Sequence, residues 1–323
     1  MYCEGSTTMP RHAVTGALGF SGRHIAERLL ARGDDVVNLT NHPDRPDPFG
    51  GRIVARPLDL TDPAGLAASL GGVDTLFNTY WVRFRGAGVT HADAVRGSST
   101  LFEAAVAAGV RRVVHVSIAN PSPTSRLSYY RGKAQVEAAL ATSGLGFAIL
   151  RPTVLFGDEP ILVNSIAWLL RRFPVFVIPG DGRYAVQPIA VEDLADLALA
   201  GAAAEEDLTW DAVGPEVLSF TEMVEAIRTA TGSRARLVHL PGPLALAAAG
   251  ALGRLVNDTL LTGEELEALA SGLLVSRSLP RGHRRFSDWL AANGDRLGRD
   301  YLPEVARHFS PARSPSVPAG PGG

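Results

Sequence analysis

The sequence predicts an α/β protein with a doubly wound parallel sheet, followed by a smaller and mainly helical C-terminal domain. Short apolar runs alternate with helical segments between residues 11 and 150, a pattern typical of βαβ units with parallel strands. The first apolar run leads directly into a glycine-rich loop. The length of 323 residues and the hydrophobic content of 46% allow a large sheet domain and a second, smaller one.

The glycine-rich loop reads TGALGFSG and begins at the end of a predicted strand, residues 12–15. A predicted helix, residues 20–31, runs out of it. In this context Gly16 permits the tight turn, Gly19 lets the backbone approach a pyrophosphate, and Gly22 lets the helix pack against the strand. An ordinary glycine-rich turn is the alternative, but the flanking strand and helix favour a Rossmann-type dinucleotide-binding site.

Two further segments bear on the cofactor. Phe20 and Ser21 open the helix, so their backbone N–H groups and the positive end of the helix dipole are available to phosphates. Thr40 and Asn41 end the second strand, where a carboxylate would bind a ribose 2′-hydroxyl and repel a 2′-phosphate. Neither residue is acidic, and Arg45 is near in sequence. We therefore expect NADP as the cofactor, with an NAD site that lacks the acid as the alternative.

The other elements of the sheet domain follow from the apolar pattern and from glycine or proline stops. Strands are predicted at 36–39, 53–58, 75–79, 112–117 and 147–150. Helices are predicted at 63–70, 92–108 and 128–142. Because ligands bind beyond the C-terminal ends of parallel strands, polar residues at these ends should surround one crevice: Thr15, Thr40, Asp59, Asn78, Ser117 and Arg151.

Beyond residue 152 the alternation is looser. Helices are predicted at 161–172, 191–203 and 220–231, strands at 175–178 and 210–213, and mainly helix from there to 309. We assign the dinucleotide-binding domain to residues 11–160, with 185–215 returning to it, and a substrate domain to residues 161–184 and 216–309. Residues 1–10 and the proline- and glycine-rich residues 310–323 are expected to be disordered.

A Y-x-x-x-K pair, Tyr129 and Lys133, lies on the helix predicted after the fifth strand. Residues four apart share a helix face, so both side chains can act on one substrate. A nearby ammonium favours a phenolate and lowers the pKa of a phenol, which otherwise lies near ~10. An exposed Tyr–Lys pair is the alternative. Since Lys133 is the only lysine in the chain, the pair favours an acid–base role for Tyr129.

Together these motifs resemble the extended short-chain dehydrogenase/reductase superfamily, in its atypical branch of NAD(P)-binding epimerase- and dehydratase-like proteins. The matching segments span most of residues 10–200 and read TGALGFSG, LDLTD, HVS, YxxxK, RPTVLFG and QPIAVED. Residues 215–309 resemble, less specifically, the C-terminal region of proteins akin to the complex I nucleotide-binding subunit. The resemblance implies an oxidoreductase or epimerase that transfers hydride between a nicotinamide and a carbonyl or alcohol carbon of a small molecule.

The resemblance also implies roles for single residues. Tyr129 would be the proton donor or acceptor, and Lys133 would bind the nicotinamide ribose. Asp59 would meet the adenine, and Asn78 would line the path of the cofactor. Further candidates for cofactor contact stand in the matching segments: Leu60 and Pro152.

Three positions depart from the family pattern. The catalytic hydroxyl of the superfamily falls where this chain has Ala119, so Ser117 is the candidate substitute. Asn78 is followed by Thr-Tyr-Trp at 79–81 where small residues are usual, and these aromatic side chains would shape or plug an apolar pocket. Val-Gln-Pro at 186–188 replaces the arginine of nucleotide-sugar enzymes, which argues against such a substrate. The alternative to an enzyme is a catalytically silent NAD(P)-binding sensor or assembly subunit.

Composition narrows the remaining possibilities. A net charge of −2 gives no general attraction to nucleic acid or anionic membranes, and the single cysteine, Cys3, excludes a disulfide framework. The longest apolar run, residues 240–252, is shorter than the roughly 20 residues of a membrane span. We expect a cytoplasmic protein with a small-molecule substrate, no metal and no nucleic-acid or membrane partner; a homodimer is left open. The arginines within 277–285 form a candidate anion site, with a solvated loop as the favoured alternative.

Overall fold

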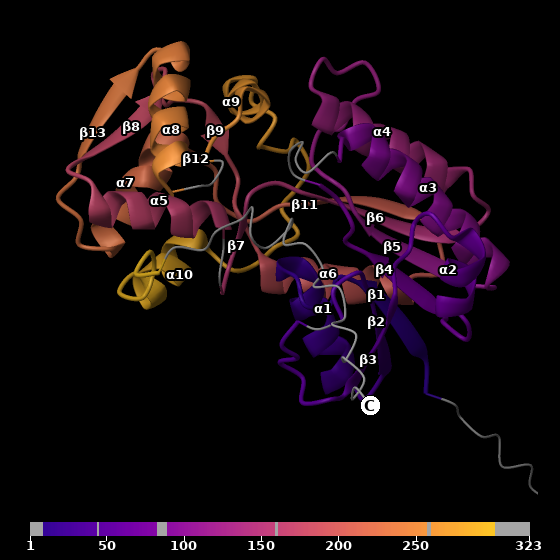
Figure 1. Ribbon diagram of the computed structural model, residues 1–323. Helices are drawn as coiled ribbons and strands as arrows, with labels where there is room; N and C mark the ends of the chain where they lie inside the picture. Colours follow the sequence, from indigo (N-terminus) through magenta and orange to yellow (C-terminus); the bar gives the residue numbers. More distant parts are fainter. Residues whose placement is uncertain (1–8, 44, 83–88, 159–160, 257–259, 301–323) are drawn as a thin grey trace, which may run out of the picture.

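The structure is a computed structural model that describes residues 9–300, apart from 44, 83–88, 159–160 and 257–259. Figure 1 shows two units, a sheet flanked by helices and a smaller unit of helices and short strands. Of the two segments predicted to be disordered, only Met9 and Pro10 fall within the described residues.

A parallel sheet of seven strands forms the larger unit, in the order β11-β6-β5-β4-β1-β2-β3. The central strand is β1 (Arg11–Thr15), with β2 (Asp35–Thr40) on one side and β4 (Thr75–Asn78) on the other. The remaining strands are β3 (Ile53–Pro57), β5 (Arg112–Val116), β6 (Gly146–Pro152) and β11 (Leu208–Ala212). The strand order reverses beside β1, which is where doubly wound sheets bind their ligands. The predicted fold class is confirmed.

Helices cover both faces of this sheet (Figure 1). On one face α1 packs against α6, and on the other α3 packs against α2 and α4. The bounds are α1 (Phe20–Ala31), α2 (Pro63–Ser69), α3 (His91–Ala107), α4 (Ser128–Ala141) and α6 (Val191–Ala203). Successive side chains of β1 point to opposite faces of the sheet. Ala13 lies in the core beneath α2–α4, and Val14 lies in the core beneath α1 and α6.

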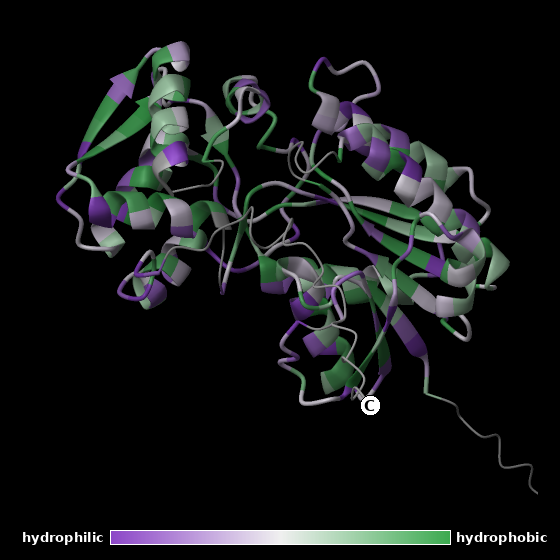
Figure 2. Cartoon of the chain, in the orientation of Figure 1, coloured by the Kyte–Doolittle hydropathy of each residue, from purple (hydrophilic) through white to green (hydrophobic). Residues whose placement is uncertain are grey.

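The smaller unit is assembled from segments far apart in the chain. Its helices are α5 (Ile161–Arg172), α7 (Phe220–Ala230), α8 (Gly242–Val256), α9 (Gly263–Ala270) and α10 (Phe286–Asn293). Its longer strands, β8 (Val175–Pro179) and β13 (Arg236–Leu240), pair in parallel. Figure 2 shows hydrophobic residues both in the strands of the main sheet and along α8.

Two pairs of two-residue strands lie near the junction of the units. They are β7 (Leu155–Phe156) with β10 (Ile189–Ala190), and β9 (Ala185–Val186) with β12 (Leu218–Ser219). The prediction of mainly helix after residue 231 is wrong at β13, where the chain is extended. The sequence RLVHL forms a strand because β8, a distant segment, supplies its hydrogen-bonding partner.

Candidate active site

The glycine loop has the geometry that its sequence predicts. Gly16 has a φ of +66°, a left-handed conformation that glycine adopts readily, and its N–H donates to the carbonyl of Leu39 at 2.9 Å. The N–H of Gly19 donates back to the carbonyl of Gly16 at 2.8 Å. A Cβ atom at Gly22 would lie 2.3 Å from the same carbonyl oxygen, so only glycine lets α1 pack this closely on the loop.

The start of α1 fits a phosphate group. Gly19 is the N-cap residue, no side chain caps the helix, and no acidic residue stands in its first turn. The N–H groups of Phe20 and Ser21 therefore open a helix whose positive end has no negative side chain of its own. Because the glycine turn and this helix end match the pyrophosphate cradle of a dinucleotide, the residues present fit NAD(P).

Beside the loop, the end of β2 carries no acid. The hydroxyl of Thr40 accepts from the N–H of His42 at 3.0 Å, and Asn41 is exposed. Burial lowers the pKa of His42, and the charge of the half-buried Arg45 acts in the same direction. Arg45 is thus a cation near this strand end, where a 2′-phosphate would need one. The preference for NADP stays a prediction.

The two candidates after β3 differ in exposure. Asp59 is exposed, and its carboxylate accepts from the hydroxyl of Thr61 at 2.6 Å and from the N–H of Thr61 at 2.9 Å, which lowers the pKa of Asp59. Leu60 packs against the hydrophobic core on the α2–α4 side. Their contacts with a cofactor stay predictions, as does that of the buried Pro152 at the end of β6.

Asn78 ties three strands together. Its side chain is fully buried, and its Oδ1 accepts from the hydroxyl of Thr15 on β1 at 3.2 Å and from the N–H of Tyr80 at 3.0 Å. Its Nδ2 donates to Nδ1 of His115 on β5 at 3.1 Å. The amide therefore fixes the strand ends beside the crevice, and a direct contact between this side chain and a cofactor stays a prediction.

Tyr129 and Lys133 both contact one aromatic side chain, Trp81. The Tyr129 ring meets the Trp81 ring edge-on at 5.6 Å between centroids, and the Lys133 ammonium lies 4.5 Å from the centroid of the same ring. His91 stacks on Trp81 at 5.9 Å and meets Tyr129 edge-on at 5.5 Å. Trp81, one of the two aromatic residues that follow Asn78, thus covers the Y-x-x-x-K pair.

Lys133 is almost completely enclosed, with 2% of its surface exposed. Its ammonium donates to the carbonyl of Val116 at 2.9 Å. Burial lowers the pKa of Lys133 to about 7, while the carboxylate of Glu137 acts in the opposite direction. A substantial share of Lys133 is therefore neutral at physiological pH, and its help to the Tyr129 phenolate depends on pH.

Ser117, the candidate substitute for the hydroxyl that is missing at Ala119, has another hydrogen-bond partner. Ser117 is buried and donates to Glu137 at 2.5 Å, and Glu137 also accepts two hydrogen bonds from Arg151, at 3.0 and 2.5 Å. These bonds join β5, α4 and β6. Ser117 is thus a partner in a buried ionic network, and an orienting role for it at the substrate stays a prediction.

The side chain of Asn120 is also used for internal hydrogen bonds. It has a φ of +55°, and its amide donates to the carbonyls of Leu273 and Val275 at 2.9 and 2.8 Å. The loop after β5 is thereby fixed to the segment after α9. Asn120 therefore holds the two units together rather than offering its amide to a substrate.

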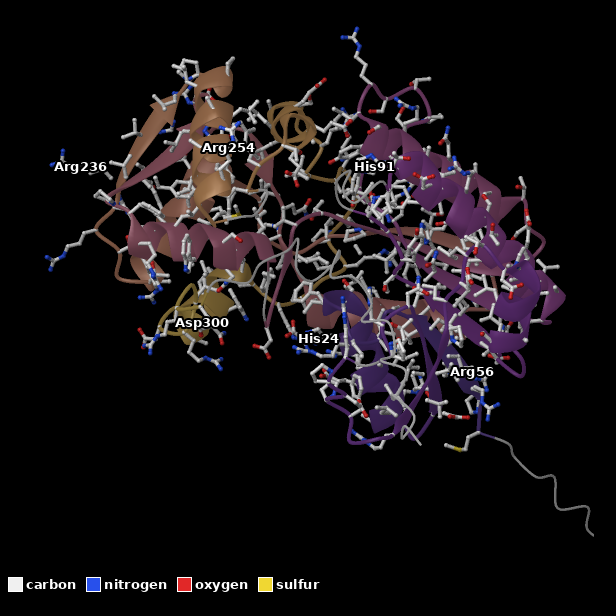
Figure 3. All side chains as sticks on the ribbon, in the orientation of Figure 1. His24, Arg56, His91, Arg236, Arg254 and Asp300 are labelled. Carbon is white, nitrogen blue, oxygen red and sulfur yellow. The ribbon has the colours of Figure 1, made fainter. Side chains whose placement is uncertain are left out.

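A cavity of about 730 Å³ lies between the two units. Most of its lining is aliphatic or aromatic and comes from α5, β8, α8 and α9. Tyr129, Tyr130 and His91 line it from the sheet unit, and so does Phe20, the first residue of α1. Figure 3 labels His91 on the part of the sheet unit that faces the smaller unit. The cavity therefore reaches from the helix after the glycine loop, past Tyr129, into the C-terminal unit.

Most lining residues of the smaller unit are absent from the sequence predictions. Leu162, Ile166 and Leu169 belong to a helix that was predicted, and Ala245 and Ala248 to a helical region that was predicted without bounds. Their apolar spacing indicates that each helix buries one face. The spacing does not show whether these apolar faces pack into a filled core or leave a cavity between them.

The arginine cluster within 277–285 is largely paired with acids. Arg284 forms a salt bridge with Asp193, and Arg285 forms one with Glu216 at 2.8 Å. The guanidinium of Arg281 lies 4.6 Å from the centroid of the Trp210 ring. These contacts fasten the segment before α10 to the rest of the chain, but the arginines stay exposed in a loop, as the favoured alternative predicted. The anion site stays a prediction.

The Val-Gln-Pro segment at 186–188 is likewise held by internal hydrogen bonds. Gln187 is buried, its Nε2 donates to the carbonyl of Gly214 at 2.9 Å, and its Oε1 accepts from the N–H of Ser276 at 3.0 Å.

Among the described residues no group of three histidine, cysteine or acidic side chains is placed to hold a metal ion. No helix in the described ranges is both long and apolar enough to cross a membrane.

Two relatives align over most of the chain. The mitochondrial NADH dehydrogenase (ubiquinone) 1 alpha subcomplex subunit 9 of Arabidopsis thaliana is 25% identical over 284 residues, which are 81% of this chain and 70% of the relative. The ceramide reductase of Caulobacter vibrioides is 28% identical over 254 residues, 74% of this chain and 76% of the relative.

A solved structure shows the same fold. An NADPH-dependent quinone oxidoreductase of Escherichia coli, determined in complex with NADPH, matches with a TM-score of 0.71 at 22% identity, over 88% of this chain and 99% of that chain. The family model described as NAD(P)H-binding matches residues 16–167, which include the glycine loop and the Y-x-x-x-K pair. Residues 16–167 therefore match the NAD(P)H-binding family, and the chain is related to extended short-chain dehydrogenase/reductase-like proteins, whose fold continues beyond that segment.

Proposed function

We propose that the protein is an NADP(H)-dependent oxidoreductase that interconverts a carbonyl and an alcohol on a small molecule with a large apolar body. The observation that carries this proposal is the position of Tyr129. Its ring lines a mainly apolar cavity of about 730 Å³, and the same cavity is lined by Phe20, where α1 leaves the glycine loop. A proton donor and the cofactor end of the site therefore face one apolar space.

The residues of the chain have separable tasks. Gly16, Gly19 and the first turn of α1 would hold the pyrophosphate, and the bound nicotinamide would supply or accept hydride. Tyr129 would give its phenol proton to the developing alcohol oxygen, or take one in the oxidation. Lys133 would stabilise the phenolate when it is protonated, and its lowered pKa makes this contribution strongest at and below about pH 7.

The substrate class follows from the cavity lining. Side chains of leucine, isoleucine, phenylalanine, valine and alanine predominate, which favours a ligand that gains free energy by leaving water. Gln187 stands where a nucleotide-sugar enzyme carries arginine, and its side chain is used for internal hydrogen bonds. Two of the compared proteins are named as a ceramide reductase and a quinone oxidoreductase, which supports an apolar substrate.

A binding protein without turnover is the second candidate. Lys133 is covered by Trp81, Ser117 is held by Glu137, and Ala119 carries no hydroxyl. One relative is named as a subunit of NADH dehydrogenase. These observations favour a sensor or an assembly subunit that binds NAD(P) through the same loop. A cytoplasmic location and a homodimer belong with these proposals.

The experiment that separates the candidates has two parts. Calorimetric titration with NADPH and NADH measures binding, and absorbance at the nicotinamide band then follows turnover of aldehydes, ketones and quinones with alkyl bodies of increasing length. The proposed enzyme binds NADPH more tightly and gains kcat/KM as the apolar body grows. Tight binding without turnover of any carbonyl compound, or of any alcohol with NADP, would favour the silent binding protein.

A further inference from the structure

The helix that carries Tyr129, α4, has no cap of its own at its start. The residue before the helix is Leu127, whose side chain has no oxygen to accept from the first N–H groups. No acidic residue stands in the first turn of α4 either. The N–H groups of Ser128 and Tyr129 are therefore open to an acceptor from another part of the chain.

Glu264 on α9 supplies this acceptor from the smaller unit. Its Oε1 accepts from the hydroxyl of Ser128 at 2.7 Å and from the N–H of Ser128 at 3.3 Å. Its Oε2 accepts from the N–H of Tyr129 at 3.3 Å. Because Glu264 also stands in the first turn of α9, the positive ends of two helices stabilise one carboxylate. One side chain of the smaller unit thus holds the backbone at Tyr129.

The carboxylate of Glu264 is ionised at neutral pH. Burial alone would raise its pKa, but the hydrogen bonds from the Ser128 hydroxyl and from the N–H groups of Tyr129 and Ser128 hold the pKa below its usual value. Hydrogen bonds to a charged acceptor are stronger than those between neutral groups. The charge therefore strengthens each of the bonds that tie α9 to the start of α4.

Apolar contacts hold α9 in the same place independently of this carboxylate. Leu127 and Tyr130, at the start of α4, form a buried cluster with Ala268 of α9. A second tether, from the amide of Asn120, binds the segment directly after α9. A substitution at Glu264 should therefore loosen the start of α4 and leave the two units in contact.

We infer that Glu264 is a positioning residue for Tyr129, which holds the start of α4 against α9 and so fixes where the phenol lies in the cavity. The inference rests on the proposed function, in which Tyr129 transfers the proton. Glu264 and Tyr129 both line the cavity. In this role Glu264 acts through Tyr129 and exchanges no proton with the substrate.

The position of the phenol matters because proton transfer needs a hydrogen bond between Tyr129 and the substrate oxygen. Tyr129 is the second residue of α4, where a backbone N–H has no partner within the helix. Displacement of a reacting group by about 1 Å can lower a rate ~10²-fold. Because α9 also supplies part of the apolar lining, the bond from Glu264 couples the substrate pocket of the smaller unit to the proton donor of the sheet unit.

The test replaces Glu264 by methionine, which has a similar length but is only a weak hydrogen-bond acceptor. With a carbonyl substrate that the parent protein reduces, Glu264→Met should lower kcat roughly 10²-fold and leave the Kd for NADPH unchanged. Glu264→Gln keeps one oxygen as an acceptor, so it should retain more of the activity. Glu267→Met, at an exposed position of the same helix, is the matched control and should behave as the parent.

Two further measurements separate positioning from a general loss of structure. In a Tyr129→Phe background, Glu264→Met should cause no further loss of kcat, because the phenol through which it acts is already absent. Hydrogen exchange at the amides of Ser128 and Tyr129 should become faster in Glu264→Met, while the middle of α4 keeps the exchange rates of the parent.

Three results would overturn the inference and leave the proposed function standing. They are parent-like kcat in folded Glu264→Met, the same loss of kcat in the Tyr129→Phe background, and unchanged amide exchange at the start of α4. A fall in NADPH affinity as large as the fall in kcat would also overturn it, because the substitution would then disturb the whole site. A parent protein that binds NADPH but turns over nothing would overturn both the inference and the proposed function.

Discussion

The glycine loop and the apolar cavity meet at Phe20, yet they are built in different ways. The loop is one continuous segment in which Gly16 has a left-handed φ, a Cβ at Gly22 would collide with the backbone, and a Cβ at Gly19 would be tightly packed. The cavity is lined by helices and strands from both units, and no short segment of the chain contains it. Local chemistry is thus enough for the loop, whereas the cavity exists only when distant segments come together.

The two regions also differ in how tightly their residues are constrained. A single added carbon at Gly22 would collide with the backbone of the loop. In the cavity, by contrast, a leucine exchanged for methionine changes the shape of the wall with little effect on the fold. We therefore expect the cofactor class to follow from the loop alone, and the substrate to follow from the packing of the smaller unit against the sheet.

The largest expected effect tests the chemistry at the cavity wall. Tyr129→Phe removes the proton donor and keeps the ring contacts with Trp81 and His91, so turnover should fall by ~10²–10⁴-fold with cofactor affinity nearly unchanged. Steady-state kinetics and calorimetry measure the two quantities. Tyr184→Phe is the matched control, because Tyr184 itself does not line the cavity, although its hydroxyl donates to the carbonyl of the lining residue Pro179. Equal losses in both variants would mean that Tyr129 has no special role.

The next effect tests the burial of Lys133. Because its pKa is lowered from 10.5 to about 7 in the folded protein, the unfolded chain binds more protons between those pH values, and stability should rise with pH across that window. Lys133→Met should therefore be more stable than the parent at pH 6, by an amount on the order of 5 kcal/mol, and the gain should shrink as the pH rises and vanish only above the unfolded pKa of 10.5. Urea unfolding at several pH values measures this. A pH-independent difference would show that Lys133 is not buried as described.

A smaller effect tests the loop. Gly19→Asp adds a Cβ atom 3.1 Å from the carbonyl oxygen of Gly16 and places a carboxylate at the helix end that is meant for phosphate. Affinity for either cofactor should fall roughly 10²-fold, since overpacking of about 1–3 kcal/mol and charge repulsion act together. Gly250→Asp, where a new side chain meets open space, is the control for the added charge. If folded Gly19→Asp bound the cofactor as tightly as the parent, the dinucleotide would not bind at this loop.

The smallest effect tests the choice of cofactor. Arg45→Ala should weaken NADPH binding about tenfold, which corresponds to about 1.4 kcal/mol, and leave NADH binding unchanged, because only NADPH carries the 2′-phosphate. Arg52→Ala, a neighbouring arginine that donates to the carbonyl of Phe49, serves as control. If the parent binds NADH more tightly than NADPH, the preference is reversed and the loop assignment still holds.

Much of the sheet unit could be predicted because its signals are local. The helices at Phe20–Ala31 and Val191–Ala203 have the predicted bounds, and most strands agree within one or two residues. The strand Arg236–Leu240 could not be predicted, because its partner β8 lies far away in the chain. The partners of Ser117 and Asn120 were missed for the same reason, since hydrogen bonds to Glu137 and Leu273 depend on how helices pack.

The sequence by itself determined the parts of this protein that depend on backbone geometry and on spacing along one element. These are the glycine loop, the helix that follows it, and the shared helix face of Tyr129 and Lys133. Only the tertiary structure decided that Trp81 covers Lys133, that Glu137 holds Ser117, and that Glu264 reaches His91 through Ser128. Each of these contacts joins residues from different elements, and burial, which sets their energies and pKa values, exists only once those elements pack.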